Sequence, residues 1–320
     1  MRVKVSVVVP TYRRNDLLTK CLARLRAQTL PSTEYEVIVA DDGPSNATAE
    51  LVAAWNRQPG APIRYVPVTA TQGPAGARNA GWRMVSGEIV AFTDDDCLPE
   101  PEWLARGVAA CVEADAATGR TIVPLPAEPT DFQQNTAGLA TAEFITANCF
   151  VRRAVLEAVG GFDERYTLAW REDSDLHFAL LSAGYAIVRE EQAVVVHPVR
   201  QASWGISLRQ QRQGQFDPLL YKKYSALYRE RVAPLPRLYY VAVGALVFAL
   251  AAGLSGAAMA SALALGVWLA ATAWLTFQRL RATSRRWSHV VEMALTSAMI
   301  PLLSLYWRVR GALRYSAFYW

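Results

Sequence analysis

Short apolar segments rich in β-branched residues alternate with segments of helical periodicity through the first 115 residues. Each expected strand is followed by an expected helix, at 3–9 and 15–28, 36–40 and 46–57, 63–67 and 75–85, and 88–93 and 101–114. Strands that alternate with helices form a parallel sheet covered on both faces. The alternation therefore predicts an α/β fold built on a parallel sheet with helices on both faces.

The second half of the chain is less regular. Strands are expected at 144–151, 185–188 and 193–196, and a helix is expected at 173–182. In open sheets of this kind, ligands bind beyond the carboxyl ends of the strands. Polar clusters follow three strands of the first half, at 10–13 (PTYR), 41–45 (DDGPS) and 94–96 (DDD). Their convergence predicts a binding site.

The third cluster consists of three consecutive carboxylates, Asp94, Asp95 and Asp96. Three adjacent negative charges at the end of a buried strand are unfavourable unless a counter-charge is held there. Mg²⁺ and Mn²⁺ prefer oxygen ligands and often bridge carboxylates to a phosphate. The triplet therefore predicts a Mn²⁺ or Mg²⁺ ion and a nucleotide ligand, and the alternative is a solvated turn.

Charge is distributed unevenly along the chain. Residues 231–320 contain nine Arg, one Glu and no Lys, so residues 1–230 are net acidic although the chain carries +5 overall. The positive net charge of the chain therefore comes from its C-terminal region and does not indicate nucleic-acid binding. The four cysteines show no C-x-x-C spacing, which is typical of unpaired thiols in a reducing compartment.

A stretch of forty residues, 238–277, contains no charged residue and no histidine. It is about twice as long as the roughly 20 residues that span a bilayer. We therefore expect a transmembrane helical hairpin with helices at about 238–254 and 257–277. Arginines follow the hairpin closely, which predicts that both of its ends are cytoplasmic. The alternative is a buried helical subdomain of a soluble protein.

A third apolar stretch, at about 289–307, contains Glu292 and Pro301 and is followed by further arginines. We expect an interfacial helix here, with a third membrane span as the alternative. Aromatic side chains are expected at headgroup depth: Trp307, Tyr315, Tyr319 and Trp320. The predicted domains are thus a catalytic domain at 1–230 and a membrane region at 231–320.

Six motifs occur in the order PTYRR, DDG, GPAGARNAG, FTDDDC, GGFDE and WREDSDL within residues 3–200. Jointly they resemble glycosyltransferase family 2, the inverting enzymes of the GT-A fold. The resemblance implies an α/β fold with a Rossmann-like, mixed but mainly parallel sheet and helices on both of its faces. The resemblance implies that a nucleoside diphosphate sugar binds to 1–98 and that an acceptor enters from 99–230.

The resemblance also implies site residues. Donor-binding residues are expected at Pro10, Thr11, Tyr12, Asp42, Arg78, Asp94 and Asp95, and metal ligands at Asp95, Asp96 and His197. Asp42 would accept a hydrogen bond from uracil or thymine, and Arg78 would pair with the diphosphate. The alternatives are a simple turn at 41–43, a surface Arg78 and a structural His197.

Glu172 and Asp173 resemble the acidic motif of the family, in which the Asp is the general base. Inversion by direct displacement needs one carboxylate to take the proton of the acceptor hydroxyl. We expect Asp173 to be this base and Glu172 to position it. A metal ion that neutralises the departing diphosphate makes a protein acid unnecessary. The alternative is that these residues are only acids that favour a helix N-terminus.

The Q-x-x-R-W signature of processive synthases is absent, which favours transfer of one sugar. Together with the hairpin, the resemblance implies a metal-dependent hexosyltransferase of the inner membrane whose catalytic domain faces the cytoplasm. Its expected acceptor is lipid-linked or membrane-proximal, in cell-envelope polysaccharide or glycolipid synthesis. The alternatives are a polyprenyl-phosphate sugar synthase, a nucleotidyltransferase, or a non-catalytic scaffold. A nucleotidyltransferase would need a Gly-rich loop where PTYRR stands.

Overall fold

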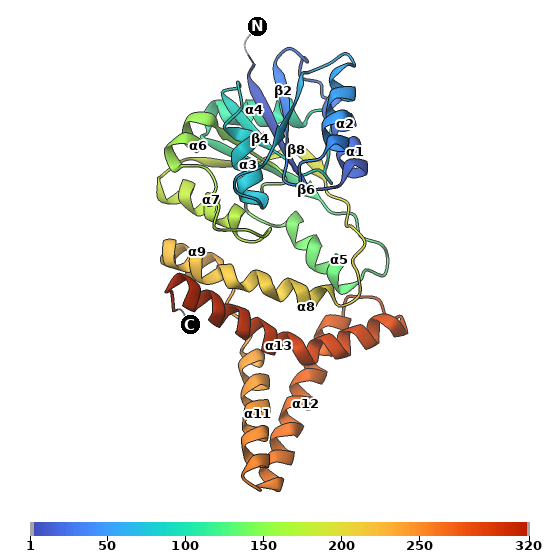
Figure 1. The fold of residues 1–320 in the computed structure, drawn as a ribbon, viewed down its shortest axis with the longest axis vertical. Helices are drawn as coiled ribbons and strands as arrows, with labels where there is room; N and C mark the ends of the chain where they lie inside the picture. The colour runs from blue at the N-terminus through green and yellow to red at the C-terminus, as the bar shows by residue number, and fades with distance from the viewer. Residues whose placement is uncertain (1–2, 319–320) are drawn as a thin grey trace. The chain divides into compact units, whose positions relative to one another are not determined.

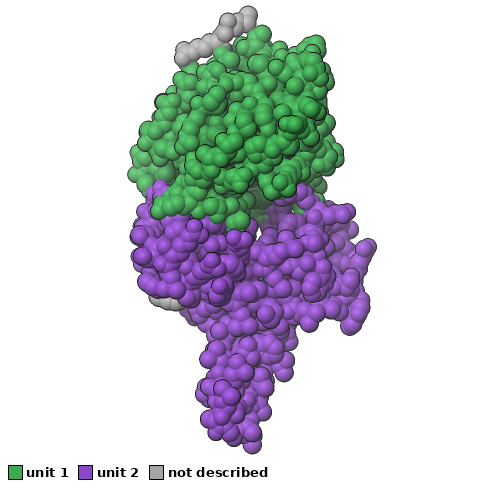
Figure 2. Space-filling model, in the orientation of Figure 1, with its two compact units in different colours: residues 1–124, 137–199 green, residues 125–136, 200–320 purple. Residues whose placement is uncertain are grey.

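The computed structural model describes residues 3–318, and the chain divides into two compact units (Figure 2). Unit 1 comprises Met1–Pro124 and Ala137–Val199, and unit 2 comprises Leu125–Thr136 and Arg200–Trp320. All the predicted site residues therefore belong to unit 1, and the long apolar helices belong to unit 2.

The described residues of unit 1 form one eight-stranded sheet in the order β3-β2-β1-β4-β7-β6-β8-β5. Strands β1 to β4 run parallel to one another, as do β6 and β8, whereas β7 and β5 run antiparallel to their neighbours. The mixed, mainly parallel sheet confirms the predicted fold class. The strands are β1 (Val5–Thr11), β2 (Tyr35–Asp41), β3 (Ile63–Pro67), β4 (Ile89–Phe92), β5 (Leu98–Pro99), β6 (Ala116–Ile122), β7 (Cys149–Arg152) and β8 (Ile187–Val196).

The second half of the sheet differs from expectation in several details. The short strand β5 and strand β6 were not predicted, β7 begins at Cys149 where a strand was expected from residue 144, and β8 is one strand where two short strands were expected. β6 pairs with both β7 and β8, and its register with β8 shifts between Gly119 and Arg120. The sequence of β6 favours a strand only weakly, and its pairing with a strand on each side stabilises it in the sheet.

Helices cover both faces of this sheet (Figure 1). They are α1 (Asn15–Arg26), α2 (Asn46–Asn56), α3 (Pro74–Trp82), α4 (Trp103–Glu113), α6 (Arg153–Val159) and α7 (Glu172–Ser182), with the short 3₁₀ helix η1 (Ala137–Ala140). Successive side chains of β1 point to opposite faces. Val7 and Val9 pack in one apolar cluster with Leu22 of α1, and Val8 packs in the other with Leu176 of α7.

Strand β1 lies between β2 and β4, so the order in which the chain builds the sheet reverses beside it. Ligands of open α/β sheets bind at this kind of reversal, beyond the carboxyl ends of the strands. Thr11 pairs in register with Asp41, and Val8 pairs with Phe92. The carboxyl ends of these three strands therefore lie next to one another.

Unit 2 is helical in its described part. Its elements are α5 (Asp131–Thr136), α8 (Ile206–Gln210), the 3₁₀ helix η2 (Gln211–Phe216), α9 (Asp217–Lys223), α10 (Ser225–Arg231), α11 (Arg237–Leu254), α12 (Ala258–Leu280) and α13 (Trp287–Tyr315). By length and composition, α11, α12 and α13 are each able to cross a membrane. α11 and α12 form a hairpin (Figure 1). Tyr319 and Trp320 lie outside the described residues.

Candidate active site

Hydrogen bonds join the ends of β1, β2 and β4 at Thr11, the last residue of β1. The carbonyl of Thr11 accepts a hydrogen bond from the backbone N–H of Asp42 at 2.8 Å, and its Oγ1 donates to Asp95 at 2.8 Å. Arg14 donates to the other oxygen of Asp95 at 3.2 Å. Burial raises the pKa of Asp95 to about 6. The polar clusters at the three strand ends therefore meet at one edge of the sheet.

The two carboxylates that follow β2 have different partners. Asp41 accepts hydrogen bonds from the backbone N–H groups of Gly43 and Ser45 and from the hydroxyl of Tyr65, at 3.0, 3.3 and 3.1 Å. It therefore braces the loop. Asp42 accepts from the backbone N–H of Gly73, with its two oxygens at 2.8 and 3.0 Å. A carboxylate has about four lone-pair sites, so Asp42 keeps capacity to accept from a base.

Tyr12 is 48% exposed, whereas the preceding Thr11 is buried. A Cβ atom added at Gly43 would lie 2.8 Å from the ring of Tyr12, so glycine is needed for this close contact. Arg13 has a φ of +54° and holds its guanidinium 5.3 Å from the centre of the same ring. Pro10 pairs with Ala40 just below this turn. The strand end thus presents a supported, exposed aromatic ring, which suits stacking against a base.

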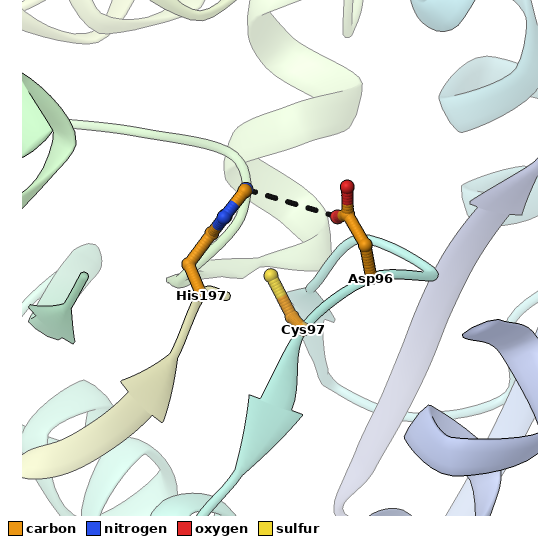
Figure 3. Close-up of side chains that lie close together, drawn as sticks. All are labelled: Asp96, Cys97 and His197. Atoms are coloured by element: carbon orange, nitrogen blue, oxygen red, sulfur yellow. Dashed lines mark ion pairs between the residues drawn. The ribbon is translucent and has the colours of Figure 1, made fainter. Parts of the chain in front are cut away.

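Asp96, Cys97 and His197 place one potential ligand atom each within 4.8 Å of one another (Figure 3). β5 and β8 bring them together, because Leu98 pairs with Val196 in an antiparallel ladder. That pairing puts the residues just before β5 opposite the residue just after β8. The Nε2 atom of His197 lies 3.7 Å from Oδ1 of Asp96.

The side chains of Asp96 and His197 fit a Mn²⁺ or Mg²⁺ ion. Oxygen and imidazole ligands suit these ions, and their ligand atoms lie about 2.0–2.1 Å from the metal, so atoms 3.7 Å apart can share one ion. Burial and the charges of Asp94 and Asp96 raise the pKa of the Cys97 thiol. Thiolate sulfur suits softer metals than Mn²⁺ and Mg²⁺, so the oxygen and nitrogen ligands of Asp96 and His197 are the better candidates. Asp95, also predicted as a ligand, accepts one hydrogen bond on each oxygen, from Thr11 and Arg14, and like Asp42 it keeps lone pairs for a metal or a ribose hydroxyl.

Arg78 connects two acidic groups that are far apart in the sequence. Its guanidinium lies 2.7 Å from Asp94 and 3.2 Å from Glu172, and its side chain is 5% exposed. Burial opposes the charge of Arg78, but Asp94 and Glu172 outweigh it and raise the pKa of the guanidinium. The triplet that follows β4 and the acidic pair of α7 therefore share one buried cation.

The acidic pair opens α7. Arg171 precedes it with a φ of +74°, which turns the chain into the helix. Glu172 is buried, and its Oε2 has no hydrogen-bond partner among the described residues. Burial, and then the charge of Asp173, raise the pKa of Glu172 to about 7. Asp173 is partly buried, accepts a hydrogen bond from the backbone N–H of Ser174 at 2.6 Å, and has a pKa that burial raises.

Asn79 has a role that the sequence analysis did not predict. Its side chain is fully buried, donates to the carbonyl of Phe162 and to Glu164, and accepts from the backbone N–H of Phe162 and the indole N–H of Trp82. These bonds tie α3 to the loop that leads towards α7. A polar side chain that is buried needs hydrogen-bond partners. The one sequence signal for this role was the position of Asn79 among small residues of an expected helix, where an asparagine is buried easily.

Comparison with known proteins gives a consistent result. Residues 6–160 match the family Glycosyl transferase family 2. The chain is 30% identical over 209 residues to glycosyltransferase AglE of Haloferax volcanii, an alignment that covers 61% of this chain and 67% of AglE. It spans only 52 and 56% of the length of two other curated relatives.

Two solved structures share the fold. The mannosyltransferase PcManGT from Pyrobaculum calidifontis, solved with GDP-mannose and Mn²⁺, superposes with a TM-score of 0.56 at 21% identity, over 99% of this chain and 88% of that chain. Residues 1–349 of TarS from Staphylococcus aureus, solved with UDP-GlcNAc, give a TM-score of 0.51 at 18% identity, over 99% and 93%. These two superpositions show that the chain has a GT-A-like fold. The chain therefore belongs to glycosyltransferase family 2, whose members transfer a sugar from a nucleotide sugar.

Proposed function

We propose that the protein is a metal-dependent inverting hexosyltransferase that moves one sugar from a nucleoside diphosphate sugar to a hydroxyl of a lipid-linked or membrane-proximal acceptor. The observation that supports this most directly is the double ion pair of Arg78. It holds Asp94 of the triplet and Glu172 of the acidic pair at 2.7 and 3.2 Å within one unit. The triplet proposed to bind the donor and the acidic pair proposed to supply the base then lie in one site.

In this proposal the edge formed by β1, β2 and β4 binds the donor. Tyr12 stacks against the base, Asp42 accepts a hydrogen bond from uracil or thymine, and Thr11 and Pro10 line the pocket. Asp96 and His197 hold Mn²⁺ or Mg²⁺, which neutralises the departing diphosphate when bound. Asp95, braced by Thr11 and Arg14, keeps the metal loop in place. The PcManGT complex contains Mn²⁺ beside GDP-mannose, which favours a metal here and makes a guanine donor the competitor to test.

Asp173 takes the proton of the acceptor hydroxyl in this proposal. A general base works best when its pKa lies near the operating pH. Burial raises the pKa values of both Glu172 and Asp173 towards that range. Glu172 is held by Arg78 and orients the start of α7, so it is the positioning residue of the pair.

Replacing the metal-binding carboxylate is expected to weaken donor binding only when metal is present. Asp96→Ala should lower Mn²⁺-dependent nucleotide affinity by at least roughly tenfold, because loss of even an outer-shell partner of a metal ligand costs about 10–100-fold. Calorimetry with UDP, with and without Mn²⁺, measures this. Asp16→Ala, an exposed acid in the first turn of α1, is the control. Equal Mn²⁺-dependent affinities in all three proteins would rule out Asp96 as a ligand.

Transfer is expected to depend on pH through the acidic pair. A base must be ionised, and burial raises the pKa of Asp173 above its usual range, so the rate should fall as the pH drops through this raised pKa. Glu172→Gln removes the like charge beside Asp173 and should move the midpoint of the pH–rate profile to lower pH. Identical midpoints in the variant and the parent would contradict this coupling.

The same pKa shift predicts how stability varies with pH. Glu172 titrates near 4.5 when unfolded and at about 7 in the folded protein, so between these values the folded state binds the extra proton. The free energy of unfolding should therefore decrease as the pH rises through this window. Denaturant titrations from pH 4.5 to 7.5 measure this slope. It should become smaller in Glu172→Gln, and the raised pKa values of Asp95 and Asp173 should account for what remains.

The membrane part of the proposal concerns unit 2. Three of its described helices are long and apolar enough to cross a membrane, and we propose that α11 and α12 do so in the inner membrane. The nine arginines of 231–320 then keep the ends of this hairpin, and with them the catalytic unit, in the cytoplasm. A membrane-attached transferase fits an acceptor used in cell-envelope polysaccharide or glycolipid synthesis.

One experiment tests the activity as a whole. Nucleotide sugars are first screened for Mn²⁺-dependent thermal stabilisation of the protein, with UDP, dTDP and GDP donors. The stabilising donor is then labelled in its sugar and incubated with enzyme and bacterial membranes. Label in the lipid extract is the expected result. Label only in water-soluble saccharides would refute the lipid-linked acceptor, and label in a polyprenyl phosphate would indicate a polyprenyl-phosphate sugar synthase.

A further inference from the structure

Helix α13 has two faces of opposite character. The buried residues lie on one side of it: His289, Met293, Thr296, Ser297, Ile300, Pro301, Ser304, Gly311 and Ala312. On the opposite side, at helical spacing, is a row of exposed apolar residues, named here the α13 stripe: Leu295, Met299, Tyr306, Val309 and Leu313, each 44–64% exposed. The buried face therefore mixes polar and apolar side chains, whereas the exposed α13 stripe is apolar.

The buried face of α13 packs against the polar segment of α8, η2 and α9. Arg308 pairs with Asp217 at 2.7 Å, and Glu292 accepts a hydrogen bond from the backbone N–H of Gly205 at 2.7 Å. A Cβ added at Gly311 would lie 2.1 Å from the carbonyl oxygen of Gln215, so the helix and η2 are in close contact. If α13 crossed the membrane, this charged segment would enter the hydrocarbon with it, which is strongly unfavourable.

The middle of α13 is attached to the end of α12. Arg279 lies one residue before the C-terminus of α12 and donates to the hydroxyls of Thr296 and Ser297, at 2.7 and 3.1 Å. The same guanidinium pairs with Asp131 at 2.7 Å. If α12 spans the bilayer, its end lies at the membrane surface, and so does the middle of α13. A spanning α13 would instead have its middle beside the middle of α12.

Figure 1 shows the same arrangement within unit 2. α13 runs across the end of the α11–α12 hairpin, with α8 and α9 on the side away from the hairpin tip. The face opposite α8 and α9, which carries the α13 stripe, therefore points to the side on which the hairpin extends. Exposed arginines lie at both ends of the helix, with Arg285 and Arg286 before it and Arg310 and Arg314 in its last turns.

We propose that α13 lies in the plane of the membrane surface, with the α13 stripe in the lipid and its arginines at the level of anionic headgroups. An amphipathic helix binds a bilayer by burying its apolar face at the boundary between headgroups and chains, and basic residues add attraction to anionic lipids. The protein then crosses the membrane twice, and both ends of α13 stay on the cytoplasmic side. This inference rests on the membrane attachment proposed above.

Sidedness of labelling tests the topology in the full chain. Three variants each carry one added cysteine. Ser288→Cys and Ser316→Cys place it near the two ends of α13, and Ala257→Cys places it at the hairpin turn. The four native cysteines are buried, so the parent protein provides the background. A membrane-impermeant maleimide should label Ser288→Cys and Ser316→Cys in inverted inner-membrane vesicles, and Ala257→Cys in right-side-out vesicles. Labelling of Ser288→Cys and Ser316→Cys from opposite sides would overturn the proposal.

Depth of immersion tests the stripe itself. A fluorophore attached to Met299→Cys, in the stripe, is compared with one attached to Leu269→Cys, an exposed position in the middle of α12. Lipids brominated near the headgroup should quench the first, and lipids brominated near the chain ends should quench the second. Quenching of both at equal depth would mean that α13 spans the bilayer, and no quenching at Met299→Cys would mean that the stripe does not contact lipid.

The two measurements also separate this inference from the membrane attachment on which it rests. If Ala257→Cys were labelled from the cytoplasmic side and Leu269→Cys were not quenched, the spanning hairpin would be refuted. Shallow quenching at Met299→Cys would still support a surface helix in that case.

Discussion

Asp173→Asn is expected to lower kcat by roughly 10²–10⁴-fold, the usual contribution of a general base, while leaving the Kd of the nucleotide sugar unchanged. The amide oxygen of asparagine keeps the acceptor for the backbone N–H of Ser174, which Asp173 binds at 2.6 Å, so the first turn of α7 is retained. The amide does not take up a proton at neutral pH. Single-turnover transfer of a labelled sugar measures the chemical step, and calorimetry measures donor binding.

Asp16→Asn is the matched control for this variant, because Asp16 is also an acid in the first turn of a helix and is exposed. It should transfer at the parental rate. A parental kcat in Asp173→Asn would eliminate Asp173 as the base. Weakened donor binding in Asp173→Asn would instead show that the residue acts through the donor site.

Arg78→Met is expected to lower the free energy of unfolding by about 3–5 kcal/mol, the cost of removing one partner from a buried ion pair, and to abolish transfer. The substitution leaves Glu172, which is buried, and Asp94, which is partly exposed, without their shared cation. Since Arg78 lowers the pKa of Glu172, its loss should raise that pKa further. The destabilisation should therefore shrink at acidic pH, where Glu172 is neutral.

Arg83→Met is the control for Arg78→Met. Arg83 directly follows α3, the helix that carries Arg78, and pairs with Glu164 at 3.2 Å, but its side chain is 55% exposed. Exposed pairs contribute about 0–1 kcal/mol, so this variant should unfold at nearly the parental denaturant concentration. Equal unfolding free energies of the two variants, measured by tryptophan fluorescence in detergent, would show that the Arg78 bridge does not stabilise unit 1.

Much of unit 1 was predictable because three of its first four strands, β1, β2 and β4, are buried on both faces. Continuous apolar runs bounded by turn residues marked β1 to β4 to within about two residues, and polar residues directly after them marked the edge where Thr11, Asp42 and Asp95 meet. By contrast, β6 has the sequence AATGRTI, which has few of the residues that favour strands. Hydrogen bonding to β7 and β8 stabilises β6 as a strand. These partners are distant in the sequence, so a local pattern does not reveal them.

Sequence pattern alone identified the fold class, the acidic triplet and the apolar hairpin, because each of these is a local signal: periodicity, adjacent like charges, or a long stretch without charge. Tertiary structure decided the rest. The pairing of β5 with β8 brings His197 to Asp96, the packing of α3 aims Arg78 at Glu172, and Arg279 fixes the middle of α13 at the end of α12. Each of these contacts joins residues separated by 17 to 101 positions, and only the folded backbone determines which distant side chains share a buried point.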